Sequence, residues 1–251
     1  MGNVFMKVRI RILQIHAAEN CNFHCEHCTA GAPSMNKKYY TYNDYSSYID
    51  KLAAYVTTSR FDVMGGEPFL NPNLLDIIKG LKQSAFDAPV NIVTNGYWLR
   101  HNISKYENIF KAADSIGITI HPELNMSGND VRKITSTIED KYSIKISVAK
   151  PSLFYKLKFV DEPVIRKHCK FCPQLTPDGN ITKCHIIAFH DRYTASPPDK
   201  FTTLSKEGVF NINTGNTASI EKWYKGRGDG LHECCNYCRY MEDKSAIIKH
   251  N

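Results

Sequence analysis

Nine cysteines in a chain of 251 residues, gathered at two places, constrain this sequence more than any other feature. Three of them lie within residues 21–28, and the other six lie between residues 169 and 238. Their number is odd, and the N-terminal segment lacks the apolar stretch of a secretory signal. We therefore expect the thiols to bind metal in the reducing environment of the cytoplasm rather than to form disulfides.

The N-terminal group reads Cys21-Asn-Phe-His-Cys25-Glu-His-Cys28, which is a C-x3-C-x2-C spacing. Three thiolates this close together can hold three corners of a 4Fe–4S cubane. The fourth iron is then open to another ligand, which distinguishes this arrangement from a closed four-cysteine cluster or a structural zinc site. A zinc site is the alternative interpretation, with His24 or His27 as its fourth ligand.

Strand and helix patterns alternate through the first 150 residues. The sequence predicts strands over residues 8–16, 60–64, 90–94, 115–120 and 143–149. It predicts helices over residues 42–58, 73–84, 104–113 and 130–140. This alternation favours βαβ units and a parallel sheet, which right-handed crossovers wind into a barrel or partial barrel.

Ligands of parallel sheets bind at the carboxyl ends of the strands. Three unusual stretches of this sequence follow predicted strands: the cysteine loop, Gly65-Gly66-Glu67-Pro68, and Thr94-Asn95-Gly96. We therefore expect these three stretches to meet at one rim of the sheet.

These motifs together resemble the radical S-adenosylmethionine (SAM) superfamily, whose signature is the C-x3-C-x2-C loop after the first strand. The resemblance implies that the amino and carboxylate groups of SAM chelate the open iron of the cluster. It further implies that an electron from the cluster cleaves SAM and that the resulting 5′-deoxyadenosyl radical abstracts a hydrogen from the substrate. A reductant such as flavodoxin or ferredoxin is then needed as a partner.

The resemblance also implies which residues bind SAM. Residues 65–68 resemble the family's GGEP motif, whose backbone binds the amino group of SAM, and backbone approaches a ligand closely only where no side chain intervenes. Asn95 stands in a TNG sequence that the family places near the ribose and carboxylate of SAM. His121, at the next strand end, is either a SAM or substrate contact or a loop residue, and we favour the loop role. The predicted SAM-binding residues are Gly65, Gly66, Glu67, Pro68, Asn95 and His27.

The six later cysteines accompany a predicted hairpin, with Pro177-Asp178-Gly179 at its turn, and a predicted helix over residues 219–224. They resemble the SPASM/twitch module of many radical SAM enzymes, and their number fits one auxiliary 4Fe–4S cluster better than two. A zinc ribbon is the alternative. The predicted ligands are Cys172, Cys184, Cys235 and Cys238, with Cys169 competing with Cys172, and Cys234 with Cys235.

The predicted fold class is therefore α/β: a radical SAM partial (β/α)6 barrel with a small C-terminal hairpin-plus-helix module. We expect the core to cover residues 1–160 and the auxiliary module to cover residues 161–251. Two segments, 154–167 and 189–215, connect the cysteine groups. Lys200, Asp191 and Arg192 are polar candidates for a substrate cleft there, although a solvated loop is the favoured interpretation.

Chains of this length with one twitch cluster resemble 2-deoxy-scyllo-inosamine dehydrogenases. The resemblance implies oxidation of a secondary alcohol of a sugar or aminocyclitol-like small molecule, with the auxiliary cluster accepting an electron and a base accepting the hydroxyl proton. Radical epimerisation of a sugar or amino acid is one alternative, with Cys169 or Cys234 as hydrogen donor. Maturation of a ribosomal peptide is another. A non-enzymatic iron–sulfur carrier is disfavoured, because it needs no SAM motifs.

The charge pattern predicts a solvated surface. The formal net charge is +7, but the Lys and Arg residues are scattered without a run of five, so we expect no nucleic-acid partner. No apolar run approaches the roughly 20 residues that span a membrane. The expected partners are a small-molecule substrate and a reductant, with no membrane.

Overall fold

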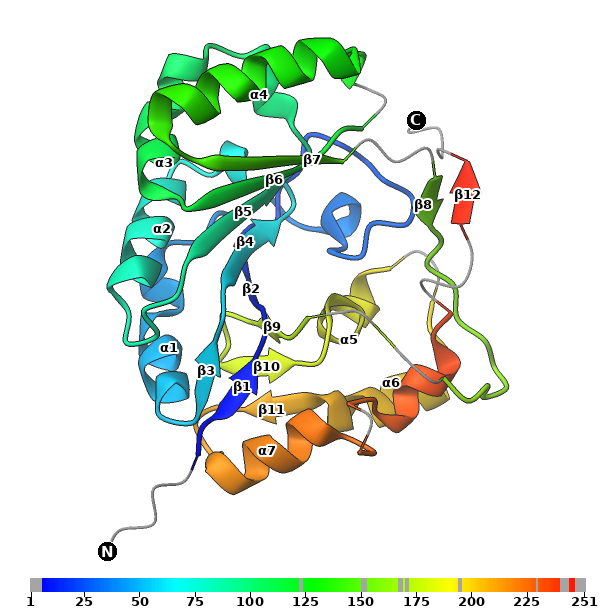
Figure 1. Ribbon diagram of the computed structural model, residues 1–251. Helices are drawn as coiled ribbons and strands as arrows, with labels where there is room; N and C mark the ends of the chain where they lie inside the picture. Colours follow the sequence, from blue (N-terminus) through cyan, green and yellow to red (C-terminus); the bar gives the residue numbers. More distant parts are fainter. Residues whose placement is uncertain are drawn as a thin grey trace, which may run out of the picture.

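The computed structural model describes residues 6–121, 124–149, 153–166, 169, 172–193, 196–228, 230–239 and 244–246. Its main feature is a curved, eight-stranded sheet with helices α1 to α4 along one face (Figure 1). The strand order in this sheet is β11-β10-β9-β2-β4-β5-β6-β7. No described helix is long and apolar enough to cross a membrane.

The main sheet consists of β2 (Leu13–Ala18), β4 (Phe61–Gly65), β5 (Val90–Thr94), β6 (Ser115–Thr119), β7 (Lys145–Ala149), β9 (Gln174–Leu175), β10 (Asn180–Thr182) and β11 (Val209–Asn211). The six neighbouring strands from β9 to β7 are parallel, whereas β10 and β11 are antiparallel. Two small sheets pair β1 (Val8–Ile10) with β3 (Val56–Thr58), and β8 (Leu153–Tyr155) with β12 (Lys244–Ala246). The predicted α/β class with a parallel-rich sheet is confirmed, and the described strands form an open sheet.

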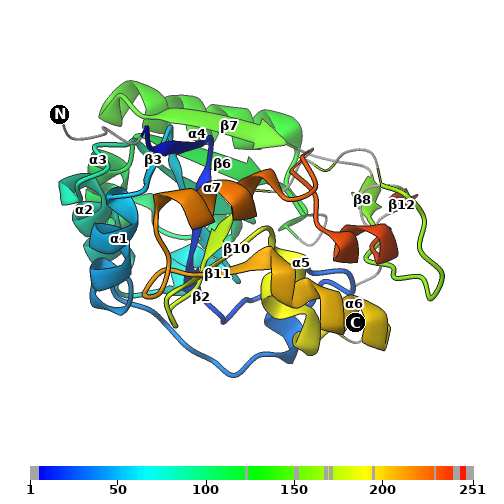
Figure 2. The same cartoon turned by 90° about the horizontal axis from the view of Figure 1, so that it is seen from below.

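Helices α1 to α4 cover the outer face of this sheet, and the other helices lie elsewhere (Figure 1). The α-helices are α1 (Ser46–Ala53), α2 (Leu74–Gln83), α3 (Glu107–Ala112), α4 (Gly128–Tyr142), α5 (His185–Phe189), α6 (Asp199–Ser205) and α7 (Thr217–Lys225). Short 3-10 helices are η1 (Ala32–Ser34), η2 (Tyr42–Asp44), η3 (Pro68–Leu70), η4 (Tyr97–Arg100), η5 (Ile103–Tyr106), η7 (His190–Arg192), η8 (Lys206–Gly208) and η9 (Glu233–Tyr237). Helix α7 lies beside β11 (Figures 1 and 2), and the rings of Trp223 and Phe210 are 5.9 Å apart.

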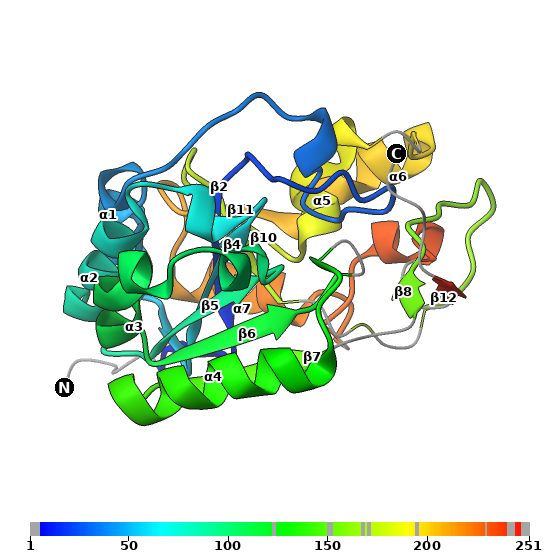
Figure 3. The ribbon, with the colours of Figure 1, turned by 90° about the horizontal axis from the view of Figure 1, so that it is seen from above.

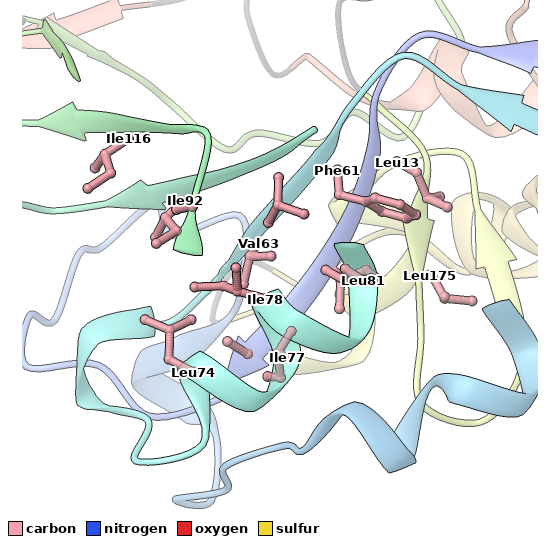
Figure 4. Close-up of a cluster of buried hydrophobic side chains, with 14 of the residues drawn as sticks. Leu13, Phe61, Val63, Leu74, Ile77, Ile78, Leu81, Ile92, Ile116 and Leu175 are labelled. Atoms are coloured by element: carbon pink, nitrogen blue, oxygen red, sulfur yellow. The ribbon is translucent and has the colours of Figure 1, made fainter. Parts of the chain in front are cut away.

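The main core lies between the sheet and helices α1 to α4. Helix α2 buries Leu74, Ile77, Ile78 and Leu81, a spacing that places all four side chains on one face (Figure 4). Along β2, Leu13, Ile15 and Ala17 belong to this core, so the alternating side chains of Gln14 and His16 face the concave side. The concave side is therefore the part of the sheet that is available for a site.

Two predicted elements differ from the structure. The strand predicted over residues 8–16 divides into β1 and β2, which belong to different sheets. The helix predicted over residues 42–58 ends at Ala53, and its last residues form β3 instead. Val56, Thr57 and Thr58 are β-branched, which favours an extended backbone that pairs with β1.

The predicted hairpin is present, but it belongs to the main sheet. Strand β9 pairs in parallel with β2, with Gln174 opposite Gln14 and Leu175 opposite Ile15. Strand β10 then returns antiparallel to β9. The sheet therefore crosses residue 160, and the division of the chain into modules at that point stays a prediction.

Candidate metal centre and ligand cavity

The three N-terminal cysteines line one cavity of about 270 Å³ at the carboxyl edge of the sheet. Figure 3 shows the loop after β2, in blue, passing above this edge toward α5. The three stretches that the sequence places at strand ends therefore meet at one rim, as predicted. The complete lining is Cys21, Phe23, Cys25, Glu26, His27, Cys28, Thr29, Ala30, Met64, Gly65, Gly66, Val93, Thr94, Asn95, Thr119 and His121.

Gly65 and Gly66 let the end of β4 lie directly against the start of the cysteine loop. A Cβ atom on Gly65 would lie 2.3 Å from the carbonyl oxygen of Ala18, and one on Gly66 would lie 2.2 Å from that of Asn20. The backbone N–H of Gly66 donates to the Ala18 oxygen at 2.7 Å, and that of Glu67 donates to the Asn20 oxygen at 2.9 Å. The two glycines are thus required for loop packing, and they leave bare backbone in the cavity wall.

Glu67 is fully buried and binds protein donors. Its Oε1 accepts hydrogen bonds from the Phe69 N–H at 3.0 Å and the Thr94 hydroxyl at 2.7 Å, and its Oε2 accepts one from the Asn95 N–H at 2.9 Å. Burial raises the pKa of Glu67 to about 7, against the opposing effect of these hydrogen bonds. Neither Glu67 nor the buried Pro68 lines the cavity. The carboxylate therefore joins the ends of β4 and β5.

Asn95 connects the end of β5 to the cysteine loop. Its Nδ2 donates to Asn22 Oδ1 at 3.0 Å and lies 3.7 Å from the sulfur of Cys21. Its Oδ1 accepts a hydrogen bond from the backbone N–H of Tyr97 at 2.9 Å. Asn95 therefore lies beside the cysteine loop, at the rim where we expected these two stretches to meet.

Two histidines line the same cavity. His27 does so as expected, with a half-buried side chain. His121 also lines the cavity, and its Nδ1 lies 3.9 Å from the sulfur of Cys25. The sequence analysis favoured a loop role for this residue instead. Met64 and Thr119 also line the cavity, and the sequence analysis did not predict this. Their positions at the ends of predicted strands could have indicated it.

The electrostatics of the three thiols suit a bound cation. Burial raises the pKa of Cys21 to about 12 and that of Cys25 to about 12, and the neighbouring cysteines raise the pKa of Cys25 further. Burial also raises the pKa of Cys28. Thiolates in this cavity need positive charge beside them, which iron supplies. Within the described ranges, no three His, Cys, Asp or Glu side chains form a group that could hold a single metal ion.

The second cysteine group surrounds a small cavity of about 20 Å³. Cys184 and Cys238 are buried, and the surrounding side chains of Ile186, Ile187 and Phe201 are apolar. Four of the cysteines around this cavity would supply the donor set of a four-cysteine iron–sulfur site. The cysteines that line this cavity are Cys169, Cys184, Cys234, Cys235 and Cys238.

Cys172 does not line this cavity, whereas its competitor Cys169 does. The charged side chains that affect Cys172 are those of Asp62, Arg11 and Arg60. The reason lies in the next residue, because the carbonyl of Pro173 accepts a hydrogen bond from the N–H of Gln14 at 2.9 Å. Cys172 is therefore held beside the main sheet.

Cys234 and Cys235 both line this cavity. A hydrogen bond between the two thiols lowers the pKa of Cys235, helped by the charges of Arg166 and Arg227, and raises the pKa of Cys234.

An open α/β sheet that gathers three cysteines and a Gly-Gly turn around one cavity defines a class of enzyme that holds a metal cluster at the carboxyl edge. The model of the radical SAM superfamily matches residues 15–145, about half of the chain, and the chain belongs to this superfamily. Membership implies SAM and a 4Fe–4S cluster as cofactors.

Curated relatives share part of this sequence. A probable GTP 3′,8-cyclase of Saccharolobus solfataricus is 26% identical over 186 residues, which are 72% of this chain and 56% of the relative. A second, of Methanocaldococcus jannaschii, is 25% identical over 167 residues, which are 64% of this chain and 55% of the relative. The chain thus spans about half the length of these relatives.

Two solved structures have a related backbone at low similarity. BtrN in complex with AdoMet and 2-DOIA is 15% identical, with a TM-score of 0.48, over 94% of this chain and 95% of that one. Streptococcus suis SuiB bound to S-adenosylmethionine is 12% identical, with a TM-score of 0.43, over 57% of this chain and 34% of that one. These likenesses are too weak to bear on function.

Proposed function

We propose that this radical SAM enzyme oxidises a secondary alcohol of a sugar or aminocyclitol-like small molecule. The observation that supports the proposal is the second cysteine group, with Cys169, Cys184, Cys235 and Cys238 around one cavity. When bound, SAM and the two clusters supply a radical that removes a hydrogen atom and an acceptor for the remaining electron. A redox-neutral reaction such as epimerisation does not need that acceptor.

The residues that line the first cavity have different roles. Cys21, Cys25 and Cys28 hold the cluster, and the bare backbone of Gly65 and Gly66 contacts SAM. A proton acceptor for the substrate hydroxyl must lie within reach of this cavity. The titratable side chains in its wall other than the thiols are Glu26, His27 and His121, and we propose the imidazoles as the candidates.

A second candidate function is cyclisation of GTP. It is favoured by one observation: the two curated relatives, which match up to 72% of this chain, are named after this activity. The two candidates require different substrates and give different products. They can therefore be separated in one assay.

The first experiment counts iron and sulfide per chain after anaerobic reconstitution. We expect about eight irons in the wild type and about four in the Cys21/Cys25/Cys28→Ala triple variant, as two four-iron clusters require. About four irons in the wild type would remove the support for an electron acceptor, and the alcohol oxidation would be abandoned.

The second experiment supplies SAM and a reductant with either cyclitol and sugar alcohols or GTP. Alcohol oxidation is expected to give 5′-deoxyadenosine together with a product two hydrogens lighter than the alcohol. A product of unchanged mass would indicate epimerisation, and turnover of GTP alone would favour the cyclase. The triple variant is the control, because it must give no 5′-deoxyadenosine.

A further inference from the structure

Arg166 is a buried arginine in the wall of the small cavity that the second cysteine group surrounds. Only 7% of the residue is exposed. The other described side chains that line this cavity are five thiols and the apolar side chains of Ile186, Ile187 and Phe201. A guanidinium keeps its charge, and burying a charge costs free energy unless opposite charge or hydrogen bonds compensate it. A buried guanidinium beside several thiols therefore indicates that this cavity holds negative charge.

Hydrogen bonds fix Arg166 against the segment that carries the last cysteines. Its Nη1 donates to the backbone carbonyl of Cys238 at 2.5 Å, and its backbone N–H donates to Asn236 Oδ1 at 3.1 Å. Asn236 lies between Cys235 and Cys238 and is itself buried. The positive charge is therefore held at one place beside these cysteines.

The charge of Arg166 acts on these thiols. Besides a hydrogen bond to Cys234, two arginine charges lower the pKa of Cys235, those of Arg166 and Arg227. Arg227 is more accessible, with 22% of its side chain exposed, and its Nη1 lies 3.9 Å from a carboxylate oxygen of Glu233. Solvent and this carboxylate weaken the field of Arg227, so Arg166 supplies the stronger of the two fields.

A fixed positive charge changes the redox properties of an iron–sulfur cluster, because the cluster gains one negative charge when it is reduced. Apolar surroundings, such as those of the buried Cys184 and Cys238, disfavour this extra charge and lower the reduction potential. A nearby cation favours the reduced form and opposes this effect. It therefore makes the cluster a better electron acceptor.

We propose that Arg166 raises the reduction potential of a cluster held by the second cysteine group. The inference rests on the proposed function, in which the substrate radical loses one electron to this cluster and one proton to a base as the carbonyl product forms. Arg166 does not contact the substrate in this role. It is a positioning residue, which acts through the cluster that it faces.

The test is a redox titration of the reconstituted full chain, followed by EPR. The Cys21/Cys25/Cys28→Ala triple variant is the reference, because only the second cluster remains in it. Adding Arg166→Gln should lower the ratio of reduced to oxidised cluster about tenfold at the midpoint potential of the reference, which is about 59 mV for one electron. Arg166→Met should give the same fall, whereas Arg166→Lys keeps the charge and should restore most of the ratio.

Arg227→Gln is the matched control. Arg227 also bonds to this segment, since its Nη1 donates to Asn236 Oδ1 at 3.0 Å, but Glu233 partly neutralises its charge. The ratio should therefore change less than in Arg166→Gln. An equal change in these two variants, or in Arg166→Lys and Arg166→Gln, would show that the charge of Arg166 is not the cause and would overturn the inference.

Iron analysis separates this inference from the proposed function. About four irons per chain in the triple variant, with an unchanged potential after Arg166→Gln, would overturn the role of Arg166 and leave the alcohol oxidation standing. A triple variant without iron would remove both. Loss of iron from Arg166→Gln with a normal thermal melt would mean that Arg166 serves cluster assembly, and the inference would also fall.

Discussion

The hydroxyl of Tyr193 donates a hydrogen bond to the carbonyl oxygen of Thr29 at 2.6 Å, one residue beyond the third cysteine of the first group. The same hydroxyl lies 3.2 Å from the carbonyl oxygen of His185, one residue beyond Cys184 of the second group. One side chain therefore contacts the backbone next to both cysteine groups. Arg192 adds a second connection, through Glu19, to the strand before the first group.

Tyr193→Phe removes this connection and leaves the ring in place. We expect the free energy of unfolding to fall by about 1 kcal/mol, which is typical for one intramolecular hydrogen bond. Iron should also leave the reconstituted protein faster when a chelator is added, because the loop that carries Cys28 is less restrained. The measurements are urea unfolding and the rate of iron release. Tyr55→Phe, remote from both groups, is the control, and equal iron release from both variants would contradict the expectation.

Cys169→Ala and Cys172→Ala form a matched pair that tests which of the two cysteines binds the second cluster. Removing Cys169 takes one thiol from the second cavity, so we expect the iron count to fall by about four per chain. Removing Cys172 should leave the count unchanged, because that residue lies beside Asp62 and Arg60 instead. Iron analysis of both variants after reconstitution decides between them, and the reverse result would restore Cys172 as the ligand.

Gly66→Ala should disrupt the first site. The new methyl group would lie 2.2 Å from the carbonyl oxygen of Asn20, so the start of the cysteine loop would have to move. We expect loss of SAM binding in equilibrium dialysis, together with loss of iron from the first group. Gly117→Ala is the control, since its nearest contact would be an ordinary 3.6 Å to Ser147. Normal SAM binding by Gly66→Ala would show that the loop adapts.

Glu67→Gln should destabilise the protein, although the shape of the side chain is kept. The amide nitrogen would replace one carboxylate oxygen, so one donor now bonded to that carboxylate would face another donor. We expect a loss of about 1–3 kcal/mol in urea unfolding, as for a buried donor without a partner. Glu221→Gln removes only an exposed ion pair with Lys225 and should change the stability by less than about 1 kcal/mol.

The raised pKa of Glu67 also predicts a pH dependence. Folding raises this pKa from 4.5 to about 7, so the folded state holds the proton more tightly than the unfolded state between these values. The contribution of Glu67 to stability is therefore fully present below about pH 4.5 and is lost as the pH rises to about 7. Unfolding at pH 5 and pH 8 should show a larger drop for the wild type than for Glu67→Gln. Equal drops would mean that Glu67 is ionised at a normal pKa.

Much of this architecture is local and could be predicted from the sequence. Residues 90–94 form a strand with the predicted bounds, and the cysteine loop follows its strand as expected. What could not be predicted depends on pairing across the chain. The docking of Pro173 beside Gln14, which holds Cys172 next to the main sheet, could not be read from the spacing of the cysteines.

The pairing of β9 with β2 has a consequence for the order in which the protein is made. Gln14 and Gln174 are partners in the sheet, yet 160 positions of sequence separate them. During synthesis β2 therefore emerges long before its neighbour β9. Contacts between such distant segments slow folding, because a long chain must close before they form. The sheet that carries the cysteine loop on β2 is therefore complete on its β9 side only after residue 174 has been made.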